Sequence, residues 1–211
     1  MVEQAREPAG YQHSGGRRAE FSSPYEVVKR VLDVALATIG LVLAIPLAAA
    51  LAIAIRLESS GPVFFRQVRV GLDGELFRIV KFRTMHWPPT PDVHRDHVVR
   101  IAGSGREERP VLRLDDDPRI TRVGRFMRKW SLDELPNLWN VLIGEMSIVG
   151  PRPIVPYEVE ALDRTALRRL EAKPGVTGLA QVNGRLDLSI HQRSDLDLAY
   201  VQSRSLKTDL L

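Results

Sequence analysis

The chain has 211 residues and a formal net charge of +4, with 44% hydrophobic and 27% charged residues. This length and composition allow one packed domain with a short appendage, and they exclude a chain that is disordered throughout. The absence of cysteine excludes a disulfide scaffold, a zinc-thiolate site and a thiol nucleophile.

Residues 1–24 are rich in Gly, Arg, Ser and Gln and show no apolar period, which predicts a flexible leader. No apolar core follows a basic start in this part of the chain, so the segment does not resemble a secretory signal.

The most apolar segment, residues 34–55, contains 22 residues without a charge. A helix that spans a bilayer needs about 20 apolar residues, whereas a helix on the surface of a soluble protein keeps a polar face. The segment therefore predicts a membrane-associated helix, which we place at residues 25–57. The charged residues that border the apolar segment are Lys29, Arg30, Asp33, Arg56 and Glu58.

Pro46 lies inside this segment, where it removes a backbone hydrogen bond and bends a helix. The two halves are about 18 Å and about 14 Å long at 1.5 Å per residue, and neither crosses a hydrocarbon layer of about 30 Å alone. Because basic residues lie on both sides, the positive-inside rule does not choose an orientation. A kinked span and a re-entrant helix that bends at Pro46 both stay open at this point.

Residues 61–85 have the pattern of a β-hairpin. Residues 63–70 and 76–82 are the predicted strands, and Gly71-Leu-Asp-Gly74 is the predicted turn.

Residues 86–110 predict a long loop, because they contain several prolines and glycines. Its His94 and His97 are more typical of a surface than of a zinc site, which needs three or four ligands. The predicted helical stretches that follow are two within residues 118–149, one amphipathic helix over residues 156–172 and one from about Asp195 to the end.

Four arginines recur every three residues, and we call them the arginine row: Arg119, Arg122, Arg125 and Arg128. On a helix this spacing brings the side chains near one face. Guanidinium groups bind phosphate through paired hydrogen bonds, but they also bind anionic lipid headgroups or nucleic acid. A solvated helix face is the alternative without a function.

Ser131-Leu-Asp-Glu134 follows the arginine row directly. The structural interpretation is a capping box in which Ser131 and Glu134 satisfy backbone N–H groups. The functional interpretation is chemical, because an Asp carboxylate such as Asp133 can attack phosphorus. A second carboxylate, Glu134, can hold Mg²⁺ against phosphate oxygens.

Two further motifs have both structural and functional interpretations. Asp115-Asp-Asp117 can hold a metal, but the following Pro118 favours a helix cap. Gly150-Pro-Arg-Pro153 and Pro174-Gly-Val-Thr-Gly178 predict stiff turns, the first of which fixes Arg152 between two prolines as a preorganised donor.

Together these motifs occur in a specific order, which is Lys29-Arg30-x-x-Asp33, the Pro-broken apolar segment, Gly61-Pro-Val-Phe-Phe-Arg-Gln67, Lys81-Phe-Arg-Thr-Met85, Asp117-Pro-Arg-Ile-Thr-Arg-Val-Gly124, Ser131-Leu-Asp-Glu-Leu-Pro136, Met146-Ser-Ile-Val-Gly-Pro-Arg-Pro153, Pro174-Gly-Val-Thr-Gly178 and Gln181-Val-Asn-Gly-Arg185. Over residues 24–211 this set resembles the bacterial sugar transferase family, the monotopic polyprenyl-phosphate phosphoglycosyltransferases.

The resemblance implies transfer of a sugar-1-phosphate from a UDP-sugar to undecaprenyl (polyprenyl) phosphate, with release of UMP and a covalent aspartyl phosphosugar intermediate. This reaction would initiate the synthesis of an exopolysaccharide, O-antigen or other glycoconjugate. By motif match, Asp133 is the nucleophile, Glu134 the Mg²⁺ partner and Arg128 a phosphate contact. The other residues that we predict to contact phosphate or substrate are Arg125, Arg152, Arg185, Lys81 and Arg83.

The resemblance also implies that the helix is re-entrant, with Pro46 as its bend and both ends in the cytosol. The predicted fold is α+β and mostly helical, with one compact cytosolic catalytic domain, residues 58–211, that contains a small β-hairpin. We expect it on the cytoplasmic face of the bacterial inner membrane. The expected partners are the bilayer, a UDP-sugar and polyprenyl phosphate, and not nucleic acid; downstream glycosyltransferases and a second copy of the chain are further candidates.

Two other functions are compatible with parts of the sequence. A non-catalytic membrane adaptor would use the arginine row for anionic lipid, but no second partner-binding module is evident. A membrane-tethered nucleic-acid binder rests on basic charge alone. The loop at residues 86–110 is longer than in the smallest family members, and the chain ends at Leu211, where many relatives continue.

Overall fold

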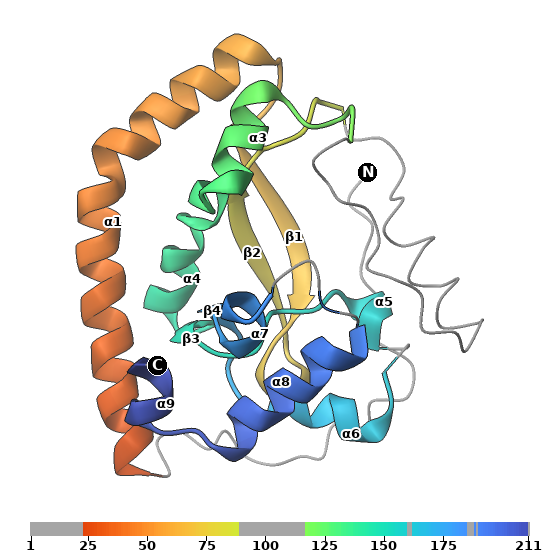
Figure 1. The fold of residues 1–211 in the computed structure, drawn as a ribbon. Helices are drawn as coiled ribbons and strands as arrows, with labels where there is room; N and C mark the ends of the chain where they lie inside the picture. Colours follow the sequence, from red (N-terminus) through yellow and green to blue (C-terminus); the bar gives the residue numbers. More distant parts are fainter. Residues whose placement is uncertain (1–22, 89–116, 160–161, 185–187, 189, 211) are drawn as a thin grey trace.

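The computed structural model describes residues 23–88, 117–159, 162–184, 188 and 190–210 (Figure 1). Residues 1–22 of the predicted leader, together with His94, His97 and Arg185, lie outside the described residues, whereas Pro24, the last residue of that leader, begins the first helix. The elements in chain order are α1 (Pro24–Glu58), β1 (Phe64–Val70), η1 (Leu72–Gly74), β2 (Leu76–Phe82), α3 (Arg122–Lys129), η3 (Leu132–Glu134), α4 (Asn137–Ile143), β3 (Ser147–Val149), α5 (Pro156–Val159), α6 (Arg164–Leu167), η4 (Arg168–Glu171), β4 (Gly175–Thr177), α7 (Leu179–Val182), α8 (Ile190–Gln202) and α9 (Leu206–Leu210).

α1 is a single helix of 35 residues. The Ser23 hydroxyl accepts a hydrogen bond from the Glu26 N–H at 3.3 Å, and Pro24 occupies the first helical position, so the sequence itself sets where the helix begins. Pro46 lies inside the helix, and the ribbon changes direction in its upper part (Figure 1). Among the described residues, α1 is the one helix long and apolar enough to cross a membrane, which confirms the predicted long apolar helix.

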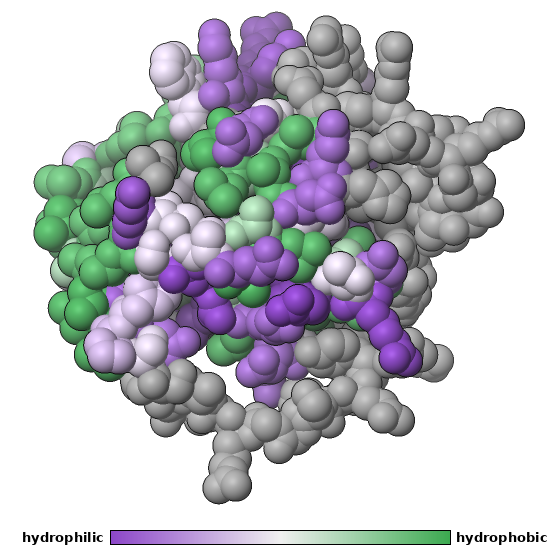
Figure 2. Space-filling view, turned by 60° about the horizontal axis from the view of Figure 1, so that its bottom comes forward, coloured by the Kyte–Doolittle hydropathy of each residue, from purple (hydrophilic) through white to green (hydrophobic). Residues whose placement is uncertain are grey.

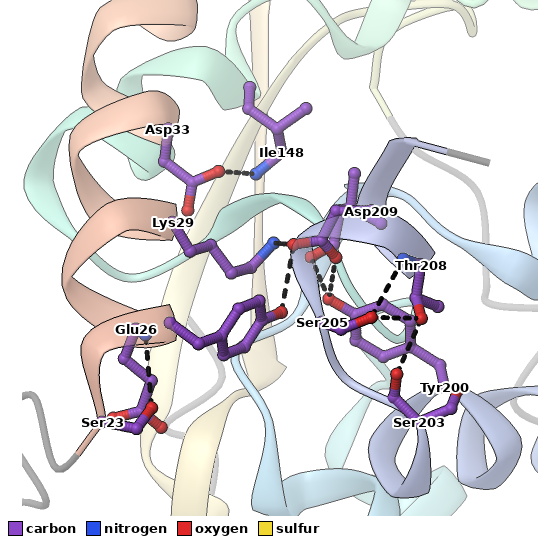
Figure 3. Close-up of polar contacts among 12 residues, drawn as sticks. Ser23, Glu26, Lys29, Asp33, Ile148, Tyr200, Ser203, Ser205, Thr208 and Asp209 are labelled. Carbon is purple, nitrogen blue, oxygen red and sulfur yellow. Dashed lines mark hydrogen bonds and ion pairs between the residues drawn. The ribbon is translucent and has the colours of Figure 1, made fainter.

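The start of α1 is bonded to the rest of the molecule through Lys29, Arg30 and Asp33, of which Figure 3 shows Lys29 and Asp33. Lys29 pairs with Asp209 of α9 at 2.9 Å. The Arg30 guanidinium donates to two carbonyl oxygens at the end of α4, at 2.6 and 2.7 Å. The buried Asp33 carboxylate accepts a hydrogen bond from the Ile148 N–H of β3 at 2.9 Å. This motif therefore docks the helix onto α4, β3 and α9.

The end of α1 is bonded to the same body. Leu51 and Ile55 are buried in a cluster with Phe82 of β2 and Met127 of α3. The Glu58 carboxylate accepts the first two backbone N–H groups of α3 at 2.6 and 2.8 Å, where the helix dipole favours a negative charge.

The face of α1 that points away from this body is apolar and exposed. Figure 2 shows hydrophobic residues along the side of the molecule where α1 lies. The exposed large hydrophobic residues between the two docked ends are Leu36, Ile39, Val42, Leu43, Ile45 and Leu47.

β1 and β2 form the predicted hairpin, with Phe64 opposite Phe82 and Val70 opposite Leu76. The turn is η1, where Asp73 and Gly74 have positive φ angles of 52° and 84°, which glycine adopts at little cost. Phe77 and Ile79 of β2 pack in a cluster with α1 and α4, so the hairpin is held against the long helix.

The two predicted stiff turns cross each other next to a short parallel sheet of β3 and β4. A Cβ atom on Gly175 would lie 2.1 Å from the Gly150 backbone nitrogen, and a Cβ on Gly178 would lie 2.1 Å from the Gly150 carbonyl oxygen. Only glycine allows backbones to approach this closely. The crossing fixes the chain just before Arg152.

Two helix predictions need correction. Residues 156–172 do not form one amphipathic helix, because Asp163 caps a new helix by accepting a hydrogen bond from the Ala166 N–H at 2.7 Å. The region therefore contains α5, α6 and η4. The last helical stretch begins at Ile190 rather than near Asp195, and it breaks before α9, where Ser205 accepts from the Thr208 N–H at 3.2 Å.

Candidate active site

A cavity of about 530 Å³ lies between the β1–β2 hairpin, η3, α7 and the turn that follows β3. Its charged lining is mostly basic, which attracts an anion of high charge. The charged side chains that line it are Arg69, Lys81, Arg128, Arg152, Arg193, Asp133 and Glu134.

The two carboxylates stand on η3 and not at a capped helix start. Ser131 has a positive φ of 56° and makes no side-chain capping bond, so the predicted capping box is wrong. Leu132 and Leu135 instead pack in the cluster beneath α1 and hold the chain in a short 3₁₀ turn. This turn places Asp133 and Glu134 together in the cavity wall.

Glu134 is held by two basic side chains. Lys81 Nζ lies 2.5 Å from Glu134 Oε1, and Arg152 Nη1 lies 3.7 Å from the same oxygen. Both Lys81 and Glu134 are largely buried, with 16% and 19% of their side chains exposed. A charge-assisted bond of this kind fixes the direction of the carboxylate.

Asp133 is a largely buried carboxyl group whose pKa is shifted by its surroundings. Burial raises the pKa of Asp133 above its ordinary value, and the charge of Glu134 adds to this effect. The charges of Lys81 and Arg128 lower the pKa and so favour the ionised form. A buried carboxyl in a cleft, with its pKa set by specific partners, is typical of a functional group.

Arg128 reaches the cavity from the last turn of α3. Its Nε donates a hydrogen bond to Thr84 Oγ1 at 2.9 Å. α3 comes close enough for this bond because Gly124 has no Cβ atom. A Cβ at this position would lie only 2.1 Å from the Thr84 carbonyl oxygen. Thr121 caps the helix by accepting from the Gly124 N–H at 2.9 Å.

The arginine row does not form one face. Arg119 lies before α3 and pairs with Asp117 at 2.6 Å, while Arg122 and Arg125 are exposed and do not line the cavity. Of the row, only Arg128 lines the cavity. The predicted capping role of Asp117 is also wrong, because Thr121 caps the helix and Asp117 bonds to Arg119 instead.

Arg83 is also placed away from the cavity lining. Its buried guanidinium donates to the Ser59 and Ser60 carbonyl oxygens, just after α1. Lys81 and Arg152, by contrast, line the cavity and come together at Glu134.

Sequence reasoning missed Arg69 and Arg193 as cavity residues. Arg69 could have been found from strand alternation, because it shares one face of β1 with Gln67 and Phe65, which also line the cavity. Burial lowers the pKa of Arg69 to about 10. Arg193 lies on α8, and no motif in the sequence marked it.

Mg²⁺ fits this set of donors only together with a phosphorylated ligand. Among the described residues, no group of three or more His, Cys, Asp or Glu side chains could hold a metal. Mg²⁺ commonly uses one or two carboxylates and completes its shell with substrate phosphates and water. Asp133 and Glu134 are adjacent carboxylates of this kind.

Comparison with known proteins finds similarity to sugar transferases over nearly the whole chain. The family model for bacterial sugar transferases matches residues 24–211. The exopolysaccharide production protein ExoY of Rhizobium meliloti is 42% identical over 186 residues, which cover 88% of this chain and 81% of the relative. The UDP-glucose:undecaprenyl-phosphate glucose-1-phosphate transferase of Escherichia coli is 40% identical over 192 residues, 87% of this chain and 38% of the relative.

A third relative, the UDP-galactose-lipid carrier transferase of Erwinia amylovora, is 40% identical over 184 residues, which cover 87% of this chain and 38% of the relative. The family match covers the docked helix, the hairpin and every residue of the charged cavity. The chain belongs to the bacterial sugar transferase family and is a transferase enzyme.

Proposed function

We propose that this protein transfers a sugar-1-phosphate from a UDP-sugar to a polyprenyl phosphate and releases UMP, as the initiating step of the synthesis of a surface glycan. The observation that carries the proposal is the pair Asp133 and Glu134 in a cavity with five basic side chains. Such a cavity suits a ligand with several negative charges. Relatives named for transfer to undecaprenyl phosphate support the same reaction class.

In the first step a carboxylate oxygen of Asp133 attacks the phosphorus that bears the sugar. An oxygen–phosphorus bond forms, the bond from that phosphorus to the bridging oxygen breaks, and UMP leaves with the electron pair. In the second step a phosphate oxygen of polyprenyl phosphate attacks the same phosphorus, and the Asp133 carboxylate is the leaving group. One cavity can thus serve two unlike substrates in turn.

The basic residues stabilise charge on the transferred group, which is most of what phosphoryl transfer requires. The hydrogen bond to Thr84 fixes the Arg128 guanidinium. The positive charge of Arg128 lowers the pKa of Asp133 and so favours its carboxylate form. Arg152 is 44% exposed at its side chain, so it can reach a ligand in the cavity. Glu134 would hold Mg²⁺, which supplies charge neutralisation at the phosphate oxygens when bound.

We further propose that α1 is re-entrant and holds the domain on the cytoplasmic face of the bacterial inner membrane. Support comes from its contacts: Asp33 near its start and Glu58 at its end bond to the same globular part. A helix that crossed the bilayer would separate these two ends by the hydrocarbon layer of about 30 Å. The exposed apolar face between them would contact the acyl chains.

The reaction is tested by measuring UMP release from a panel of UDP-sugars in nanodiscs, with undecaprenyl phosphate and Mg²⁺ present or omitted. Without acceptor, the wild type should release about one UMP per protein and retain labelled sugar phosphate covalently. Asp133→Asn should abolish both signals, whereas Asp195→Asn, an exposed position on α8, should leave them unchanged. Near-wild-type release by Asp133→Asn would remove Asp133 from the nucleophile role.

Re-entrance is tested separately with single cysteines, which the cysteine-free chain permits. Cysteines at Phe21 and at the exposed Glu75 in the hairpin turn should both be labelled from the cytoplasmic side only. Labelling of the two positions from opposite sides would show that the helix crosses the membrane.

A further inference from the structure

Three consecutive carbonyl groups in the turn that carries Arg152 are bonded by three different elements. The Pro151 carbonyl accepts from the Gly175 N–H at 2.8 Å. The Arg152 carbonyl accepts from Arg169 Nη2 at 2.9 Å. The Pro153 carbonyl accepts from Arg69 Nη1 at 3.3 Å. Because proline has no N–H, the residues on both sides of Arg152 donate no backbone bond, and the turn depends on these acceptors.

Arg169, the donor to the central carbonyl, has a buried charge partner of its own. Arg169 of η4 forms an ion pair with Asp197 of α8. Their side chains are only 6% and 1% exposed. The pair thus touches Arg152 through its main chain and leaves its side chain directed to Glu134.

A purely stabilising role explains this pair poorly. Removing two charges from water is costly, and well-packed apolar residues often stabilise a protein as much as a buried ion pair. Burial raises the pKa of Asp197 to about 6, the direction that follows when a carboxylate is removed from water. What apolar residues could not supply is a rigid donor to the Arg152 carbonyl.

We propose that Arg169 and Asp197 are positioning residues that hold the Pro151-Arg152-Pro153 turn so that the Arg152 side chain meets the anionic part of the nucleotide sugar. Asp197 fixes the guanidinium plane of Arg169, and Arg169 fixes the Arg152 carbonyl. This inference rests on the proposed function, because it assigns Arg152 to the binding of phosphate.

A double-mutant cycle tests the proposal. Arg169→Met should lower kcat/KM for the UDP-sugar by about tenfold or more, chiefly through KM. In an Arg152→Ala background the same substitution should change kcat/KM by less than about twofold, because the group that Arg169 positions is already absent. Arg168→Met is the matched control, since Arg168 is adjacent on η4, is half-exposed and pairs with the exposed Glu171 at 3.0 Å.

Folding is monitored by thermal unfolding and limited proteolysis. Because Arg169→Met leaves a buried carboxyl without its partner, the double variant Arg169→Met/Asp197→Leu removes both charges and preserves the fold if the single variant does not. Arg169→Lys should recover only part of the activity, because a lysine cannot hold the carboxylate and the carbonyl with one planar group.

The outcomes separate two failures. If Arg152→Ala retains wild-type kcat/KM, the role of Arg152 in the proposed function is wrong. If Arg152→Ala is impaired but Arg169→Met has the same effect in both backgrounds, the positioning role is overturned. Loss of activity that follows loss of thermal stability alone, in every variant including the paired one, would also overturn it.

Discussion

Replacing Gly124 by alanine tests whether the close approach of α3 sets the position of Arg128. The added Cβ would lie 2.1 Å from the Thr84 carbonyl oxygen and 2.7 Å from the Thr84 carbonyl carbon. An ordinary contact begins at 3.4 Å, so α3 and the chain at Thr84 must separate by about 1.3 Å, the difference between 3.4 and 2.1 Å. Both obstacles are backbone atoms, which cannot turn aside as a side chain can.

Such a shift lengthens the bond from Arg128 Nε to Thr84 Oγ1, now 2.9 Å, beyond hydrogen-bonding range. Overpacking of this kind costs about 1–3 kcal/mol of stability. A misplacement of about 1 Å at a catalytic group can reduce the rate by about 100-fold. At an exposed position in a helix, replacing Gly by Ala would instead stabilise the protein by about 1 kcal/mol. The sign of the change in stability therefore distinguishes a tight contact from an exposed position.

The assay is thermal unfolding of the protein in nanodiscs, followed by tryptophan fluorescence, together with kcat/KM for UMP release. We expect Gly124→Ala to lower Tm by roughly 5 °C. Arg122→Ala on the same helix, where the side chain is exposed, should leave both quantities near wild type. A Gly124→Ala protein with unchanged or higher Tm and a rate within twofold of wild type would refute the reasoning.

Three further predictions follow from other contacts. Burial raises the pKa of Asp133, so acid should inactivate the enzyme by protonating Asp133 at a pH above the pKa of an ordinary aspartate. Because the charge of Lys81 lowers the pKa of Asp133, Lys81→Met should move the acidic limb of the pH–rate profile to still higher pH. An acidic limb that Lys81→Met does not shift would contradict this. Tyr25→Phe, which removes a 3.0 Å bond to Asp209, should lower the free energy of unfolding by about 1 kcal/mol in denaturant titrations and leave kcat unchanged, whereas no loss would show that the contact is not formed. Leu43→Asp, at a side chain 72% exposed on α1, should weaken sedimentation with liposomes while the circular dichroism spectrum is preserved; unaltered sedimentation would show that this face does not enter the bilayer.

The parts of the fold that could be predicted are those encoded by local pattern. An uncharged run of 22 residues forms one helix, and alternation around Gly71-Leu-Asp-Gly74 forms a hairpin. Breaks in the C-terminal half were harder to predict, because Asp163 and Ser205 cap new helices inside stretches with helical charge patterns. The pairing of β3 with β4 depends on contacts between distant segments, which local propensity does not determine.

The candidate site likewise contains residues that local sequence predicts and residues that depend on tertiary packing. Asp133, Glu134 and Arg128 lie close together in sequence, and short elements deliver them to one cavity. The prediction that the arginine row forms a single helical face was wrong because α3 begins at Arg122. Arg119 lies before the helix and pairs with Asp117. Arg193 depends on the packing of α8 near the turn of Arg152, a tertiary relation without a signal in the local sequence.

The contacts of α1 connect this long apolar helix to both sides of the cavity. Asp33 holds β3, the strand that leads into Arg152, and Glu58 holds the start of α3, the helix that ends near Arg128. Arg30 lies next to the apolar segment, where the positive-inside rule takes a basic residue to mark the cytoplasmic side. Its guanidinium, however, is hydrogen-bonded to carbonyl oxygens of α4. These bonds, and not the number of flanking charges, support the proposed re-entrant helix. If α1 is re-entrant as proposed, a helix held at both ends in this way would keep Arg128 and Arg152 at one depth relative to the lipid headgroups, where the phosphate of the proposed polyprenyl acceptor would lie.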